Sequence, residues 1–148
     1  MAGALGKRIA VGAAFVVTSL FSLNAISDDQ ETVDYREHVM KTMEEQIAAI
    51  SQMQKSLIAP ANLTVHTEIL ALTAATAKSA FAPKVTGGQA KAELWANWQD
   101  FSKRLDELVA FTADMDKAAK AGGLAAVVKM QSLPCKGCHD NYLQEDKK

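Results

Sequence analysis

Proline, aromatic residues and cysteine are all scarce in this chain of 148 residues. With only three prolines and many Ala, Leu and Met residues, the composition favours helices over a sheet. Aromatic residues make up 6% of the chain, so a helical core of aliphatic side chains would be thin, and a buried non-protein group would supply the missing apolar volume. The formal net charge of −1 excludes a strongly basic nucleic-acid binder.

The first 27 residues have the features of a secretory signal peptide. Lys7 and Arg8 precede an uncharged apolar stretch over residues 9–23, and Ala25 and Ser27 then offer small side chains for cleavage. We expect a cleaved signal over residues 1–27, a single mature domain over 28–148 and a periplasmic location. The alternative is an uncleaved membrane anchor. The mature chain would be mildly acidic, which suggests protein partners with basic patches.

Four amphipathic helices are predicted in the mature domain, because apolar residues recur at steps of three and four and no segment alternates with period two. The predicted helices cover residues 29–57, 63–80, 89–121 and 124–144. Breaks between them contain Pro60, Pro83, Gly87–Gly88 and Gly122–Gly123. Pro134 falls inside the last segment and should kink or restart it. Helices of these lengths with short connections predict an all-α, antiparallel up-down-up-down four-helix bundle.

The same spacing predicts which side of each helix faces the core. The expected core positions are Val33, Arg36, Met40, Met43, Ile47 and Ile50 in the first helix, Val65, Ile69, Leu72 and Thr76 in the second, and Trp98, Phe101, Leu105, Leu108, Thr112 and Met115 in the third.

The chemistry is concentrated in Cys135-Lys136-Gly137-Cys138-His139, a C-x-x-C-H sequence. Two thiols at this spacing match the two vinyl groups of a haem, and the adjacent His139 then ligates the iron. A thioredoxin-type redox pair would favour a strand–helix junction, which the pattern lacks. A zinc site would need a fourth ligand, for which no nearby residue is obviously placed. We therefore predict one covalent haem c attached through Cys135 and Cys138, although a match this short can also arise by chance.

The position of this motif near the C-terminus of a helical bundle resembles the class II cytochromes c, which comprise cytochrome c-prime and its low-spin, Met-ligated relatives. Tyr35-Arg36, Glu93-Leu94-Trp95 and the run from Cys135 to Tyr142 support the resemblance. Two departures stand out. Leu143 occupies a position where cytochromes c-prime typically have a basic residue, and Pro134 directly precedes the first cysteine.

Helical depth narrows the choice of a sixth iron ligand. In an up-down bundle Met40 and His139 lie at similar depth on facing helices, and Met43 lies on the same stripe one turn deeper. His38 is expected to face solvent, since it lies two residues from Met40. Met53 is too deep, and His66, Met115 and Met130 fall at the opposite pole. Met40 is therefore the predicted ligand and Met43 its competitor.

The family resemblance implies further roles. The position four residues after the Arg of the first helix faces the open side of the haem; it is aliphatic or aromatic in cytochromes c-prime and Met in the low-spin relatives. Met40 fills that position here. Arg36 resembles the arginine that contacts a haem propionate, and Lys91 is a weaker propionate candidate. Trp95 and Trp98 are expected to wall the haem pocket.

These observations predict a periplasmic monohaem c-type cytochrome that carries out one-electron transfer with His139/Met40-ligated iron, and that is not an enzyme. Its partners would be redox proteins, with no nucleic acid and no membrane beyond an uncleaved signal anchor, and the chain would be a monomer or a homodimer. The alternative is a five-coordinate cytochrome c-prime that binds or sequesters NO or CO. A haem-free adaptor bundle would require the C-x-x-C-H match to be accidental.

Overall fold

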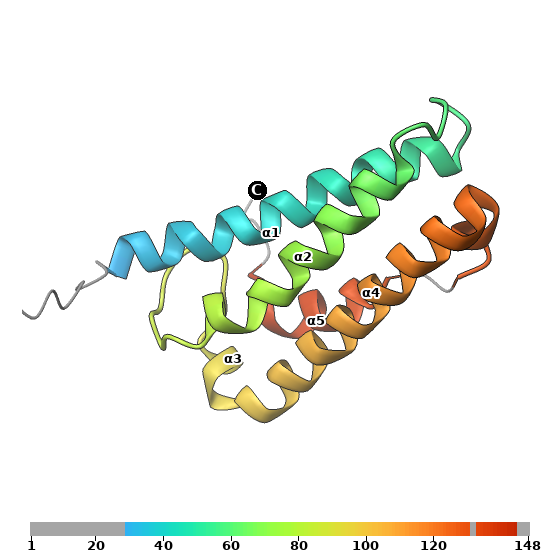
Figure 1. Cartoon of the computed structure of the whole chain (residues 1–148). Coiled ribbons are helices and arrows are strands. Elements are labelled where there is room, and N and C mark those ends of the chain that lie inside the picture. The colour runs from blue at the N-terminus through green and yellow to red at the C-terminus, as the bar shows by residue number, and fades with distance from the viewer. Residues whose placement is uncertain (1–28, 131–132, 145–148) are drawn as a thin grey trace, which may run out of the picture.

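The computed structural model describes residues 29–130 and 133–144, and all regular elements in these ranges are helices (Figure 1). In chain order they are α1 (Asp29–Gln54), α2 (Leu63–Phe81), α3 (Glu93–Ala96), α4 (Trp98–Val128) and α5 (Cys135–Tyr142). The predicted signal peptide lies outside the described residues. None of the described helices is both long and apolar enough to cross a membrane.

The predicted four-helix bundle is confirmed, and the differences lie at its breaks. The third predicted helix is divided at Asn97 into the short α3 and the long α4. Residues 124–128, predicted to open the fourth helix, continue α4 beyond a kink at Gly123, where φ is 60° and ψ is −152°. Glycine tolerates that conformation because it has no Cβ. Helical structure restarts at Cys135 directly after Pro134, a residue that fits a helix start because it has no N–H to leave unpaired.

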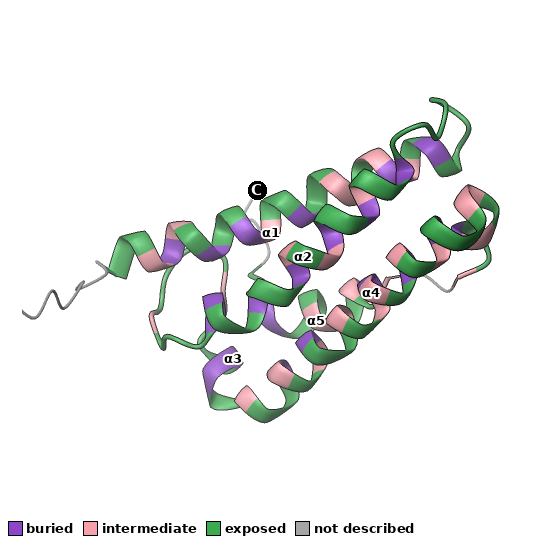
Figure 2. Ribbon diagram, viewed as in Figure 1, coloured by how far each residue is buried: buried purple, intermediate pink, exposed green. Residues whose placement is uncertain are grey.

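The predicted core face of α2 is wrong. Val65, Ile69 and Leu72 are exposed, the last at 64%. The buried residues of α2 are Leu63, Thr67, Leu70, Ala74, Ala77, Ala80 and Phe81. The reason is close packing, since α2 contacts both α1 and α4 and small alanine side chains let helices approach closely. Figure 2 shows buried positions along α1, α2 and α4, with exposed residues covering their outer sides.

The core faces of α1 and α4 largely match the prediction. Val33, Arg36, Met43 and Ile50 are buried in α1, whereas Met40 is only partly buried. In α4 the buried set includes Phe101, Leu105, Thr112 and Met115. The sequence pattern missed Val39 and Met53, which are also buried.

The helix that carries the C-x-x-C-H sequence is set apart from α1. Among the described residues, α5 packs against α3 and α4 but not against α1. A loop over residues 82–92, here called the α2–α3 loop, links the two sides of the bundle. Its Gln89 carbonyl accepts a hydrogen bond from the Gln144 N–H at 2.8 Å, and its Lys91 N–H donates to the Tyr142 carbonyl at 3.0 Å. The space between α1 and α5 is therefore bounded at one end by this loop.

Candidate haem site

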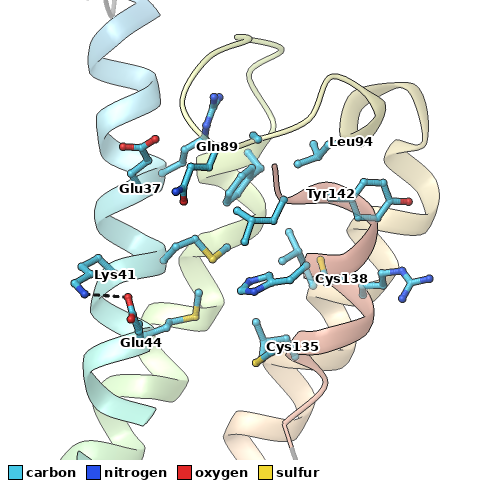
Figure 3. A pocket seen from close by; sticks show the side chains of 18 of the residues that line it. Glu37, Lys41, Glu44, Gln89, Leu94, Cys135, Cys138 and Tyr142 are labelled. Carbon is cyan, nitrogen blue, oxygen red and sulfur yellow. Dashed lines mark hydrogen bonds and ion pairs between the residues drawn. The ribbon is translucent and has the colours of Figure 1, made fainter. Parts of the chain in front are cut away.

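A cavity of about 1070 Å³ lies between α1, α2, α4 and α5. Its volume lies just above the usual range for cofactor sites, roughly 300–1,000 Å³. The inner wall is apolar and includes Met40, Met43, Ile47, Leu70, Phe101, Leu105 and Leu108. Charged side chains of α1 are on the lining at its outer side, and Figure 3 shows Glu37, Lys41 and Glu44 across the cavity from α5. An apolar slot of this size between two helices fits a haem.

The three predicted attachment residues come together on one wall of this cavity. Cys135 and Cys138 lie one helical turn apart on α5 and both face the cavity (Figure 3), and His139 is also among its lining residues. The two cysteines are not joined to each other by a disulfide. Burial raises the pKa of the Cys135 thiol, and burial raises the pKa of Cys138 to about 11, an increase that the nearby Arg104 opposes. Before attachment both sulfurs would therefore be thiols, the form from which a thioether is made by addition to a vinyl group.

Two methionines face the cavity from the opposite helix. Met40 and Met43 both line it, and Met43 is the more deeply buried, at 4% exposure. His38 is exposed, as the sequence predicted, and lies at the rim. His66 is engaged elsewhere, with its Nδ1 2.8 Å from Gln46 Oε1. The structure therefore leaves the same two candidates for a sixth ligand as the sequence did, and Met40 stays a prediction.

Arg36 is buried, and its terminal nitrogens contact the α2–α3 loop. Nη1 donates to the Val85 carbonyl at 2.6 Å and Nη2 donates to the Gly87 carbonyl at 2.5 Å. The guanidinium carbon lies 5.1 Å from the centre of the Trp95 ring, within the range of a cation–π contact. Burial lowers the pKa of Arg36. From the sequence, Arg36 is either a propionate contact or an ordinary solvated helix arginine. Its burial excludes the second, the propionate contact stays a prediction, and the structure adds that Arg36 joins α1 to this loop.

Lys91 is not among the residues that line the cavity. Its Nζ donates to the Asp140 carbonyl at 3.3 Å, and its backbone N–H donates to the carbonyl of Tyr142. These contacts place Lys91 at the C-terminal end of α5, where a cation is favourable beside exposed helix carbonyls. Its predicted propionate contact therefore has no support in this geometry.

The aromatic wall differs from the one expected. Neither Trp95 nor Trp98 lines the cavity; Phe81, Phe101 and Tyr142 do. The Phe101 ring lies 5.3 Å from both of the other two rings, in edge-to-face contacts. Trp95 stands behind them, and its Nε1 donates to the Phe81 carbonyl at 2.9 Å. The sequence pattern placed Phe101 and Tyr142 on the core stripes of their helices, but it assigned Phe81 to a loop and so missed its role in this wall.

A polar cluster behind the attachment helix was also missed. Asp100 and Arg104 of α4 form an ion pair at 2.7 Å, and the Tyr142 hydroxyl donates to the same Asp100 oxygen at 2.6 Å. The i,i+4 spacing of Asp100 and Arg104 was visible in the sequence as a helix-surface pair. Nothing in the sequence indicated that the pair would contact α5.

Known proteins similar to this chain agree with this geometry. The family model described as Cytochrome C′ matches residues 31–143. A cytochrome c′ of Alcaligenes xylosoxydans xylosoxydans is 27% identical over 119 residues, covering 76% of this chain and 93% of the relative. Among solved structures, the ferric cytochrome c prime from Alcaligenes xylosoxidans has a TM-score of 0.71 at 23% identity, covering 81% of this chain and 98% of its own. The cytochrome c prime from Shewanella frigidimarina has a TM-score of 0.68 at 20% identity, with 80% and 98% covered.

Proposed function

Because this chain belongs to the cytochrome c′ family and carries one covalent haem c, we propose that its iron binds a small diatomic ligand, NO or CO, on the face opposite His139. Solved relatives include a nitric oxide complex of a variant of the Alcaligenes xylosoxidans protein. The similar proteins reported above are named cytochrome c′, so the finer resemblance to the low-spin, Met-ligated subgroup gains no support from them.

The apolar inner wall is the observation that carries this proposal. Opposite α5, the deep lining side chains of α1 and α2 include Met43, Ile47 and Leu70. The one histidine of α1 on the lining, His38, is exposed at the rim. These deep side chains offer no hydrogen-bond donor, so the inner wall favours a small neutral ligand and disfavours water and anions, since polar groups lose solvation there.

The chain's own residues have separate roles in this function. Cys135 and Cys138 would hold the cofactor through two thioether bonds, and His139 would supply an imidazole nitrogen to the iron from α5. The bound haem supplies the iron on which the ligand binds. The apolar side chains of α1 and α2 exclude solvent from the opposite face, and the α2–α3 loop bounds that space at one end.

Ligand binding can be tested by visible absorption of the purified holoprotein. The oxidised protein should be high-spin, and dithionite-reduced protein should bind CO with one equivalent per haem and a shift of the Soret band. We expect both results because the sixth coordination position of the iron would be open and would face the apolar wall. A low-spin oxidised spectrum with a near-infrared sulfur-to-iron band, and no CO uptake after reduction, would contradict the proposal.

One-electron transfer with a His139/Met40 pair is the second candidate. It is favoured by one observation, that Met40 lines the same cavity as His139 from the facing helix. A thioether ligand would close the sixth position, stabilise Fe(II) and raise the reduction potential. The protein would then act as a carrier between redox partner proteins in the periplasm, as a monomer or a homodimer.

Paired methionine variants separate the two candidates. We expect Met40→Leu and Met43→Leu each to leave the oxidised spectrum high-spin and CO binding intact, because leucine keeps most of the apolar volume. If a sulfur-to-iron band in the wild type is lost in Met40→Leu alone, electron transfer replaces ligand binding as the function. If the sulfur-to-iron band is lost in Met43→Leu alone, the sixth iron ligand is Met43, one turn deeper on α1.

A further inference from the structure

The helix that holds the haem is fastened to α4 by three polar side chains, here called the Asp100–Arg104–Tyr142 cluster. Arg104 Nε donates to Asp100 Oδ2 at 2.7 Å, and the Tyr142 hydroxyl donates to the same oxygen at 2.6 Å. In Figure 3 the Tyr142 hydroxyl points away from the cavity. Tyr142 ends α5, so this contact fixes the end of the helix that follows His139.

Arg104 also contacts α5 at Gly137, a residue that precedes His139 in the sequence. Its Nη1 donates to the Gly137 carbonyl at 3.2 Å, between the two attachment cysteines. The missing side chain at Gly137 allows this approach, because a Cβ there would lie 3.2 Å from the same nitrogen. The cluster therefore contacts α5 at residue 137 and at residue 142, on both sides of the axial histidine.

Asp100 and Arg104 are both expected to be ionised at neutral pH. Hydrogen bonds from Arg104 and then Tyr142 lower the pKa of Asp100, and the bond to Asp100 raises the pKa of Arg104. Both groups therefore stay ionised across the neutral range. The pair is partly exposed, with side-chain exposures of 32% for Arg104 and 48% for Asp100, so solvent and salt weaken its field without removing it.

Arg104 is the cation that lines the cavity on the attachment side. The other lining cations, Arg36 and Lys41, belong to α1. Arg36 donates to loop carbonyls, and Lys41 forms exposed pairs with Glu44 and Glu45. On α5 itself, Lys136 pairs with Asp140 at 2.7 Å, and both side chains are largely exposed. Two cations therefore contact the α5 backbone near His139: Arg104 at the Gly137 carbonyl, and Lys91 Nζ at the Asp140 carbonyl. Of these two, only Arg104 also lines the cavity.

We propose that the Asp100–Arg104 pair, held at a constant position by Gly137 and Tyr142, is a positioning pair that tunes the reduction potential of the haem iron. A nearby positive charge favours the ferrous state, because that state carries one less positive charge than the ferric state. Asp100 opposes this effect, so the two residues act with opposite signs. The inference rests on the covalent haem and holds for either function proposed above.

The test is spectroelectrochemical titration of holoprotein variants. Arg104→Gln leaves the Asp100 carboxylate unneutralised and should lower the potential, reducing the ferrous-to-ferric ratio at a fixed applied potential by about tenfold, which equals 59 mV for a one-electron couple. Asp100→Asn should raise the potential, because it leaves the Arg104 charge uncompensated. Arg104→Lys keeps the charge and should restore a value near that of the wild type.

A control on the same helix is Lys117→Gln, since Lys117 is 77% exposed and pairs with Asp114 at 3.1 Å, 13 residues along α4 from Arg104. It should leave the potential unchanged, and 1 M salt should shrink the shifts in the two cluster variants. Shifts of the same sign in Arg104→Gln and Asp100→Asn, or none in either, would show that the contacts are only structural and overturn the proposal. If Arg104→Gln fails to accumulate holoprotein, the absence of a rise in Asp100→Asn is sufficient to overturn it.

Discussion

Replacing both Cys135 and Cys138 with serine should remove covalent haem and leave a chain that no longer unfolds cooperatively. A serine hydroxyl does not form the thioether bond, and the cavity of about 1070 Å³ would then have no fastened occupant. Protein interiors are close-packed, so an unfilled apolar pocket of that size leaves the inner side chains of α1, α2 and α4 without packing partners and should weaken cooperative unfolding. Intact mass and acid–acetone extraction measure attachment, and thermal melting followed by circular dichroism measures cooperativity.

The single variants are the matched controls. Cys135→Ser and Cys138→Ser each keep one thiol on the cavity wall and should keep one thioether bond, so acid–acetone should leave colour with the protein. A double variant that retained covalent haem, or that melted as sharply as the wild type without haem, would contradict this reading of the site.

The second large effect is expected at Arg36. Arg36→Met keeps the apolar stem but leaves the Val85 and Gly87 carbonyls without their donors and removes the charge over Trp95. Hydrogen bonds to a charged group contribute roughly 1.5–3 kcal/mol each, so we expect a loss of about 3 kcal/mol in the free energy of unfolding. Denaturant unfolding measures it, and hydrogen exchange should show faster exchange in the α2–α3 loop.

Two further variants serve as controls for the stability loss expected in Arg36→Met. Lys41→Met removes an exposed cation from the same helix and should change the free energy of unfolding by no more than about 0.5 kcal/mol. Arg36→Lys keeps the charge but cannot donate to both carbonyls from a planar fork, so it should lie between wild type and Arg36→Met. Equal stability of Arg36→Met and wild type would mean that the loop is held by other contacts.

Local chemistry and periodicity determined much of this protein. The C-x-x-C-H spacing predicted haem attachment because the thiols and the iron ligand are neighbours along one short helix. Helix-breaking residues marked where the helices are interrupted: α5 begins directly after Pro134, and Gly123 kinks α4 without ending it. These features depend on residues a few positions apart and need no knowledge of how the helices pack.

Only the tertiary structure decided which surfaces and side chains meet. The stripe of large apolar residues on α2 was chosen over its alanine face, yet a helix packed between two others buries the side that permits the closest approach. The partners of Arg36 are 49 and 51 residues away in the sequence. Arg104 contacts Gly137 across 33 residues, and Tyr142 contacts Asp100 across 42. Hydrogen bonds and ion pairs form wherever folding brings a donor to an acceptor, and no periodic pattern along the chain records that encounter.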